Sequence, residues 1–270
     1  MRSRYRPTPS PLHEPGDDLA LAGDRRLGCL LIHGFTATPD EVRPVAEMLA
    51  TRGFPVRLAR LAGHDSTLAE LARCRWTDWL ASAESALARL TADVERVVVG
   101  GMSMGALLAF RLAVSHPTTV AGVVSMAAPL DLGARVPAWL PWLERLPALT
   151  LRRAMIPKRN GRDISDPVAR AQSRAYEKMP LPAVLQLLAL QRAVLPDLPR
   201  VAQPTLVLHG RHDHTAPVES MAMLQARLGS RDVEAHVLEE SWHVVTEDVE
   251  RALVGRLVGD FLERVERDPR

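Results

Sequence analysis

The sequence predicts an α/β fold, built as a mostly parallel, doubly wound sheet that carries one small helical cap. Two observations lead to this prediction. From residue 27 onward, short apolar runs alternate with longer amphipathic stretches, as expected for strands joined by helices in right-handed crossovers. The alternation stops over residues 130–180, where six prolines are separated by apolar residues and no clear strand is visible.

Each expected strand is a short, nearly continuous apolar run, which is typical of strands buried on both faces. The sharpest signal is the run Val97, Val98 and Val99, which leads directly into Gly100, because β-branched residues favour extended backbone. In chain order, the expected strands are residues 27–32, 54–58, 96–99, 120–125, 205–208 and 233–238.

The stretches between and after these strands carry helix signals. Thr38, Pro39 and Asp40 are residue types that commonly start a helix, and Gly53 is one that commonly ends it. Apolar positions at helical spacing and an amphipathic ending indicate the others. The expected helices are residues 38–53, 76–90, 104–115 and 246–267.

The proline-rich interruption divides the chain into three parts. Residues 1–23 are expected to be a flexible lead-in, and residues 24–129 and 181–270 are expected to form the core. Residues 130–180 are expected to form a cap or lid of short helices, because a long insertion between two strands is where a lid sits. A poorly ordered surface excursion is the alternative for that segment.

The cap is rich in Trp and Leu. Trp139, Trp142 and Leu143 are expected to contact a substrate below the cap, within an apolar tunnel. These side chains could equally be the cap's own core, and the sequence does not decide between the two.

Composition excludes several classes of protein. Hydrophobic residues make up 47% and charged residues 24% of the 270 residues, ordinary proportions for a soluble globular enzyme. The net charge of +2 is too small to indicate a nucleic-acid partner. No apolar stretch is expected to approach the ~20 residues of a membrane span.

The cellular compartment of the protein is inferred from the absence of a recognisable secretory signal. Residues 1–15 lack the apolar core of a secretory signal, so a cytoplasmic protein is expected. Cys29 and Cys74 are too few for a disulfide framework, although one disulfide between them stays open.

The motif Gly101-Met102-Ser103-Met104-Gly105 follows the sharpest expected strand and opens an expected helix. This G-x-S-x-G pattern in a strand–turn–helix setting predicts a nucleophile elbow, with Ser103 on a tight turn above the sheet. Glycines on both sides would let the strand and helix approach closely. An ordinary serine N-cap after a glycine turn is the alternative.

A serine hydroxyl needs an imidazole to take its proton, and the imidazole needs a carboxylate to hold its tautomer. Asp213 follows the expected strand 205–208, and His243 follows the expected strand 233–238. Both therefore lie at strand ends, where such sheets place their chemistry. Because a Ser, Asp, His chain order is typical of this elbow, the sequence predicts a triad of Ser103, Asp213 and His243.

A metal site is the alternative for the residues around the acid, because His212 and His214 flank Asp213. Two histidines at this spacing with no third ligand cluster nearby are weak grounds for zinc. No metal and no cofactor are therefore expected.

A tetrahedral intermediate carries a negative oxygen that needs fixed donors. The N–H of Met104, directly after Ser103, and the N–H of Phe35, in the loop after the first strand, are expected to form this oxyanion hole. His33 is expected to orient that loop by hydrogen bonding, and direct proton transfer by His33 is the alternative.

Five motifs, in this order, resemble the bacterial carboxylesterase and monoacylglycerol lipase family of α/β-hydrolases. They are LIHGFTATP at 31–39, LAGH at 61–64, GMSMG at 101–105, GRHD at 210–213 and SWHVVT at 241–246. The resemblance spans about residues 27–265. It implies the α/β-hydrolase fold and hydrolysis of short- to medium-chain acyl esters or monoacylglycerols through an acyl-enzyme on Ser103.

The same resemblance implies a small-molecule ester or lipid as the binding partner. No integral membrane association is expected, because no apolar stretch of the required length is expected. An acyltransferase, thioesterase or C–C bond hydrolase with the same triad stays open, because the cap decides what reaches Ser103. A catalytically inactive member that serves as a binding protein is the alternative from another class. The sequence does not indicate an oligomeric state.

Overall fold

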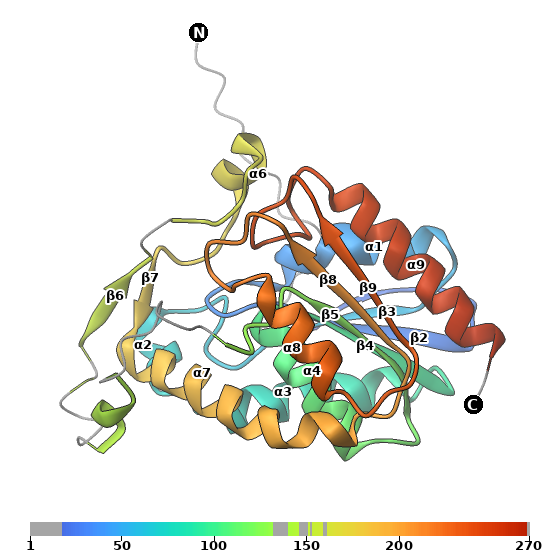
Figure 1. Ribbon diagram of the computed structural model, residues 1–270, viewed down its shortest axis with the longest axis horizontal. Helices are drawn as coiled ribbons and strands as arrows, with labels where there is room; N and C mark the ends of the chain where they lie inside the picture. The colour runs from blue at the N-terminus through green and yellow to red at the C-terminus, as the bar shows by residue number, and fades with distance from the viewer. Residues whose placement is uncertain (1–17, 132–139, 146–150, 152, 159–160, 269–270) are drawn as a thin grey trace, which may run out of the picture.

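The computed structural model describes residues 18–131, 140–145, 151, 153–158 and 161–268 (Figure 1). Its main sheet has seven strands in the order β1-β3-β2-β4-β5-β8-β9, with every neighbouring pair parallel except β1 and β3. The predicted α/β class with a mostly parallel sheet is therefore confirmed. The strands are β1 (Leu19–Leu21), β2 (Leu27–Ile32), β3 (Val56–Ala59), β4 (Arg96–Met102), β5 (Val120–Met126), β8 (Thr205–Gly210) and β9 (Val233–Leu238).

The predicted strands match closely in the centre of the sheet. β2 and β9 have the predicted bounds, and β4, β5 and β8 continue one to three residues further. β3 begins two residues later than predicted, because Gly53 at φ +85° ends the preceding helix and the Phe54 N–H still bonds to the Leu49 carbonyl. β1 was not predicted, since three residues are too short to show a period, and it lies within the segment expected to be a lead-in.

Helices cover both faces of the sheet, which makes it doubly wound (Figure 1). Two predicted helices have the observed bounds, and the first predicted helix is split into a 3₁₀ turn and α1. The helices of the core are η1 (Pro39–Val42), α1 (Arg43–Thr51), α2 (Leu68–Leu71), α3 (Trp76–Leu90), α4 (Met104–Ser115), α7 (Leu181–Val194), η4 (Leu195–Arg200), α8 (Glu219–Arg227) and α9 (Arg251–Arg267).

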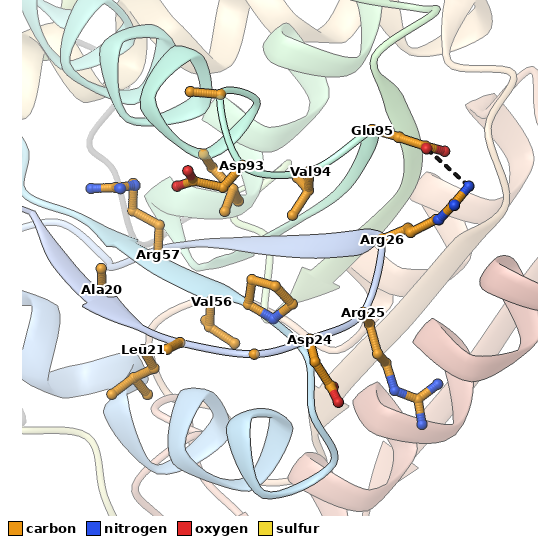
Figure 2. Close-up of a pocket in the computed structure, with 15 residues that line it drawn as sticks. Ala20, Leu21, Asp24, Arg25, Arg26, Val56, Arg57, Asp93, Val94 and Glu95 are labelled. Carbon is orange, nitrogen blue, oxygen red and sulfur yellow. Dashed lines mark hydrogen bonds and ion pairs between the residues drawn. The ribbon is translucent and has the colours of Figure 1, made fainter.

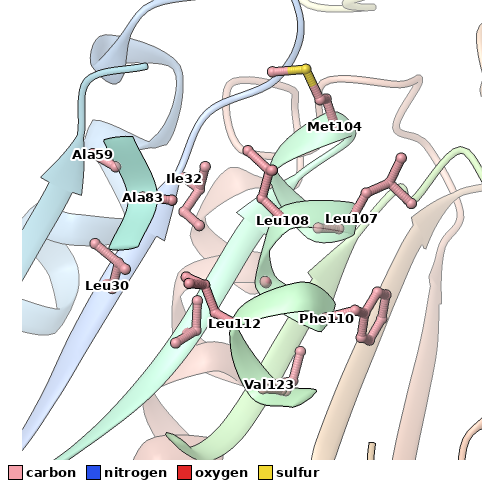
Figure 3. Close-up of a cluster of buried hydrophobic side chains, with 14 of the residues drawn as sticks. Leu30, Ile32, Ala59, Ala83, Met104, Leu107, Leu108, Phe110, Leu112 and Val123 are labelled. Carbon is pink, nitrogen blue, oxygen red and sulfur yellow. The ribbon is translucent and has the colours of Figure 1, made fainter. Parts of the chain in front are cut away.

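Two apolar layers lie against the sheet. On one face, Trp79 of α3 and Phe110 of α4 are buried with residues of β2, β4 and β5; Figure 3 shows α4 packed over these strands. On the other face, Leu49 of α1 and Phe261 of α9 pack against β2, β3 and β8. Burial of these side chains contributes about 1.5–3 kcal/mol each, so the two layers hold the strand ends, and the loops after them, in place.

The last helix begins at Arg251, five residues later than predicted. The residues before it belong to a loop in which buried Asp248 accepts hydrogen bonds from the backbone of Trp242 and Ser165. This side-chain bonding replaces the first helical turn, because an aspartate can offer the backbone an alternative to helix.

The described part of the predicted cap contains a 3₁₀ helix, a short α-helix and a small sheet. The prediction of short helices in place of strands was wrong in part, because β6 (Met155–Pro157) pairs antiparallel with β7 (Lys178–Pro180). The helical elements are η3 (Leu140–Arg145) and α6 (Pro167–Gln172). Strands of three residues give no periodic signal, and prolines at their ends concealed them.

One helix in the described part of the chain, Leu181–Arg200, is long and apolar enough to cross a membrane by length and composition. The prediction that no apolar stretch approaches 20 residues was therefore wrong. Apolar side chains of this helix pack inside the protein. Leu190 and Leu198 are fully buried against the core, and Leu185 packs against the described part of the predicted cap. This packing accounts for the apolar composition of the helix.

Candidate active site

Ser103 lies on the turn between β4 and α4. Its backbone angles, φ +53° and ψ −116°, are ones that residues with a Cβ rarely adopt. The glycines of the motif make this turn possible. A Cβ on Gly101 would lie 2.0 Å from the carbonyl carbon of Gly105, and a Cβ on Gly105 would lie 2.1 Å from the carbonyl oxygen of Ile32. The close approach inferred from the sequence is thus a feature of the structure.

The structure brings together Ser103, His243 and Asp213, which lie after β4, β9 and β8. His243 Nε2 is 3.0 Å from Ser103 Oγ, and His243 Nδ1 is 2.7 Å from Asp213 Oδ2. Because a carboxylate only accepts, Nδ1 carries the proton and Nε2 is free to accept the proton of the serine hydroxyl.

Asp213 and His243 shift each other's pKa values, so that the ionised carboxylate and the protonated imidazole are both favoured. Burial lowers the pKa of His243, but the Asp213 carboxylate, with smaller effects from Asp163 and Glu41, outweighs burial and raises the pKa above its ordinary value. Burial raises the pKa of Asp213, yet the charge of His243 and hydrogen bonds from His209 and His243 hold it well below its usual range. Asp213 therefore stays ionised beside the imidazole.

Asp213 is fixed by more groups than the sequence indicated. Its Oδ1 accepts the N–H groups of Thr215 and Ala216, both at 2.7 Å, and its Oδ2 lies 3.1 Å from Nε2 of His209. His209 is buried on β8, four residues before Asp213. No pattern in the sequence pointed to this contact.

The loop after β2, which holds Phe35, lies against Ser103. A Cβ on Gly34 would be 3.4 Å from Cβ of Ser103, an ordinary contact, but only 3.0 Å from Oε2 of Glu41, so the loop is close to Ser103 and tightly packed against Glu41. The Gly34 N–H donates to Oε2 of Glu41 at 2.5 Å, and Glu41 is buried, which raises the pKa of its carboxyl. Glu41 supports this loop, and sequence reasoning missed it.

His33 bonds within the loop rather than to the serine. Its Nδ1–H donates to the Gly34 carbonyl at 2.9 Å, and its Nε2 accepts from the Leu61 N–H at 3.4 Å. Burial lowers the pKa of His33 to about 4, so the ring is neutral. His64 packs edge-on against His33 with ring centroids 5.0 Å apart. These contacts agree with an orienting role for His33.

The predicted cap residues have different surroundings. Leu143 is partly buried and packs, with Phe35, against an apolar cluster of η3 and α7. Trp142 is 61% exposed. Trp139 lies outside the described residues. This cluster of η3 and α7 therefore reaches the loop beside Ser103 through Phe35.

The alternative metal site does not assemble around Asp213. His212 and His214 are exposed, and the His214 ring faces Asp163 with Nδ1 2.8 Å from Oδ1. Among the residues that the structure describes, no three His, Cys, Asp or Glu side chains are placed to hold a metal ion.

A cavity of about 810 Å³ lies at the opposite edge of the sheet, where β2, β3 and β4 begin (Figure 2). Arg26 and Glu95 form an ion pair of 3.1 Å along its wall, and Arg57 and Asp93 also line it. None of the lining residues belongs to the loops that carry Ser103, Asp213 or His243, so the cavity is separate from the candidate site.

Comparisons with known proteins agree with this arrangement. The family model described as serine aminopeptidase S33 matches residues 23–250. A thermostable monoacylglycerol lipase of Bacillus sp. strain H-257 is 32% identical over 228 residues, covering 84% of this chain and 87% of the relative. A carboxylesterase of Bacillus subtilis strain 168 is 26% identical over 260 residues, covering 96% and 98%.

Solved structures are similar over nearly the whole chain. A structure described for LipS and LipT, two metagenome-derived lipolytic enzymes, has a TM-score of 0.83 at 31% identity and covers 93% of this chain and 98% of its own. A monoacylglycerol lipase of Paleococcus ferrophilus has a TM-score of 0.77 at 18% identity, covering 92% and 98%, which supports the fold alone. The chain therefore has the α/β-hydrolase fold and belongs to the serine aminopeptidase S33 family of α/β-hydrolases.

Proposed function

We propose that the protein is a serine hydrolase that cleaves carboxylic esters, with short- to medium-chain acyl esters or monoacylglycerols as substrates. The observation that carries the proposal is the continuous hydrogen-bonded chain from Ser103 through His243 to Asp213. The monoacylglycerol lipase and carboxylesterase among the relatives support the ester as the bond that is cleaved.

In the proposed reaction, Ser103 Oγ attacks the ester carbonyl while Nε2 of His243 takes the hydroxyl proton. The imidazolium that forms is stabilised by the ionised Asp213, which also keeps Nδ1 protonated. His243 then donates a proton to the departing alcohol. Water, activated by the same imidazole, attacks the acyl-enzyme and releases the acid.

The negative oxygen of each tetrahedral intermediate is proposed to rest on the N–H groups of Phe35 and Met104. Met104 opens α4, so its N–H lies at the positive end of the helix dipole. The close approach of Gly34 to Ser103, and the hydrogen bond that the Gly34 N–H donates to Glu41, hold the Phe35 loop beside the nucleophile. Preorganised donors of this kind are worth about 10²–10³-fold in kcat each.

The acyl chain is proposed to lie under the cap formed by residues 130–180, against the residues predicted for it: Trp139, Trp142 and Leu143. Leu143 supports this placement, because it packs in the same cluster as Phe35.

We also propose a cytoplasmic location, since Cys29 and Cys74 are both free thiols, as is usual in a reducing compartment.

The test compares Ser103→Ala with the wild type on nitrophenyl esters, thioesters and monoacylglycerols of graded acyl length. Ser103→Ala should lose several orders of magnitude in kcat on every ester, because no other group replaces the nucleophile. Ser125→Ala is the matched control, since Ser125 is a buried serine on β5 paired with Gly101 of β4. A Ser103→Ala protein with more than about a tenth of the wild-type rate would contradict the proposal.

A further inference from the structure

Residues 163–166, which lie within the predicted cap directly before α6, are placed between the loop of Asp213 and the loop of His243. We call them the clasp segment. Asp163 is only 5% exposed and Ile164 is fully buried, although neither belongs to a helix or strand. A buried aspartate must have partners for its charge, and here the partners come from the loop that carries the acid.

On the acid side, the Asp163 carboxylate accepts three hydrogen bonds. The donors are the His214 backbone N–H at 3.1 Å, the His214 Nδ1–H at 2.8 Å and the Thr215 hydroxyl at 2.7 Å. His214 and Thr215 directly follow Asp213, whose own Oδ1 accepts the Thr215 N–H at 2.7 Å. The turn that aims Asp213 at His243 is therefore held from outside by Asp163.

On the base side, the clasp segment is bonded to residues around His243. The Val244 N–H donates to the Asp163 carbonyl at 3.1 Å. The Asp248 carboxylate accepts from the Ser165 N–H at 3.0 Å and from the Trp242 N–H at 2.8 Å. Both chain neighbours of His243 are thus tied, directly or through Asp248, to the clasp segment.

A contact between two rings also joins the acid loop and the base loop directly. The His214 ring, held by Asp163, packs edge-to-face on the Trp242 ring with centroids 4.7 Å apart. The loops of acid and base are therefore joined both through the clasp segment and directly.

We propose that Asp163 is a positioning residue that sets the separation and orientation of Asp213 and His243. The inference rests on the proposed function, because it concerns the same triad. The Asp163 carboxylate acts on the acid loop through His214 and Thr215, the Asp163 carbonyl holds the Val244 N–H, and neither acts on the substrate. A shift of about 1 Å in such a constellation can cost on the order of 100-fold in rate, so a residue that fixes both loops affects turnover without contacting the reacting atoms.

The charge of Asp163 provides a second readout. Three carboxylates act on His243: Asp213 from the acid loop, Asp163 from the clasp segment and Glu41 from η1, and each favours the protonated imidazole. Removing the charge of Asp163 therefore lowers the pKa of His243. Because the neutral imidazole is the base, the acid limb of the kcat/KM profile moves to lower pH.

The experiment compares Asp163→Ala and Asp163→Asn with the wild type by kcat, KM, the pH profile of kcat/KM and the melting temperature. Asp232→Asn is the control, because Asp232 is a partly buried acid that pairs with Arg264 at 2.7 Å. It lies at the amino end of β9, away from the carboxyl ends of the strands, which carry the triad. Asp163→Ala should lower kcat on the order of 10- to 100-fold with KM changed by less than about twofold.

Asp163→Asn keeps one acceptor oxygen but no charge, so its kcat should fall less while its acid limb shifts as far as that of Asp163→Ala. The proposal is overturned if both variants keep the wild-type kcat and acid limb, or if only their melting temperatures fall. If Asp163→Ala does not fold, Asp163→Asn decides by the same two criteria. Failure of the proposed function is distinguishable, because the wild type itself would then show no Ser103-dependent ester turnover.

Discussion

The strained backbone at Ser103 is expected to destabilise the folded protein. At φ +53° and ψ −116°, a residue with a Cβ is in a sparsely populated region, which costs about 1–3 kcal/mol. Ser103→Gly removes this strain, whereas Ser103→Ala retains it. Both variants lose the hydroxyl and its contact with His243, so the difference between them isolates the backbone.

The magnitude follows from two opposing effects. Glycine relieves the strain but increases the conformational entropy of the unfolded chain, which costs about 0.4–1 kcal/mol relative to alanine. The middle of each range makes Ser103→Gly more stable than Ser103→Ala by about 1.3 kcal/mol. For a chain of this size, that difference corresponds to about 3–5 °C in melting temperature.

The assay is urea unfolding of both inactive variants, followed by far-ultraviolet circular dichroism, with thermal scans beside it. Equal m-values would show that the midpoint difference reports stability. A Ser103→Ala protein as stable as, or more stable than, Ser103→Gly would refute the inference that the elbow is strained.

Three further predictions concern activity. Burial lowers the pKa of His243, but Asp213 outweighs burial and raises the pKa above the ordinary histidine value. The fall of kcat/KM on acidification should therefore begin at a higher pH than for an ordinary histidine. A profile that stays flat down to pH 5 would contradict this. Chelators should leave the rate unchanged, and loss with EDTA that zinc restores would favour a metal site at His212, Asp213 and His214. If Trp142 contacts the acyl chain as proposed, Trp142→Ala should change the preferred acyl length, at up to ~0.8 kcal/mol per buried CH₂. Because Trp142 is 61% exposed, the same substitution should leave the melting temperature unchanged. A lowered melting temperature with equal losses on all esters would show that Trp142 only packs the cap.

The central elements of the fold were predictable because their signals are long and periodic. α3 and α4 have the predicted bounds, and the valine run of β4 leads into the turn where it was expected. The carboxyl ends of parallel strands share one edge, which is why Ser103 and His243, 140 residues apart, lie within hydrogen-bond distance.

The supporting residues were not predictable, because each depends on a partner that no local pattern specifies. Asp163 meets His214 across 51 residues of chain, and Glu41 meets the Gly34 N–H inside a turn. His209 faces Asp213 from within a strand, where a buried histidine is usually structural. The pairing of β6 with β7 was missed for a related reason, since strands of three residues show no alternation.

The most direct test of the proposed mechanism is covalent labelling of the protein by a fluorophosphonate probe, read by intact mass and peptide mapping. The probe reacts only with a serine whose hydroxyl is activated by its neighbours. The account predicts one adduct, located on Ser103, that is absent in Ser103→Ala and forms more slowly as His243 becomes protonated at low pH. An adduct on another residue, or an unmodified wild-type protein, would contradict the claim that His243 and Asp213 activate Ser103.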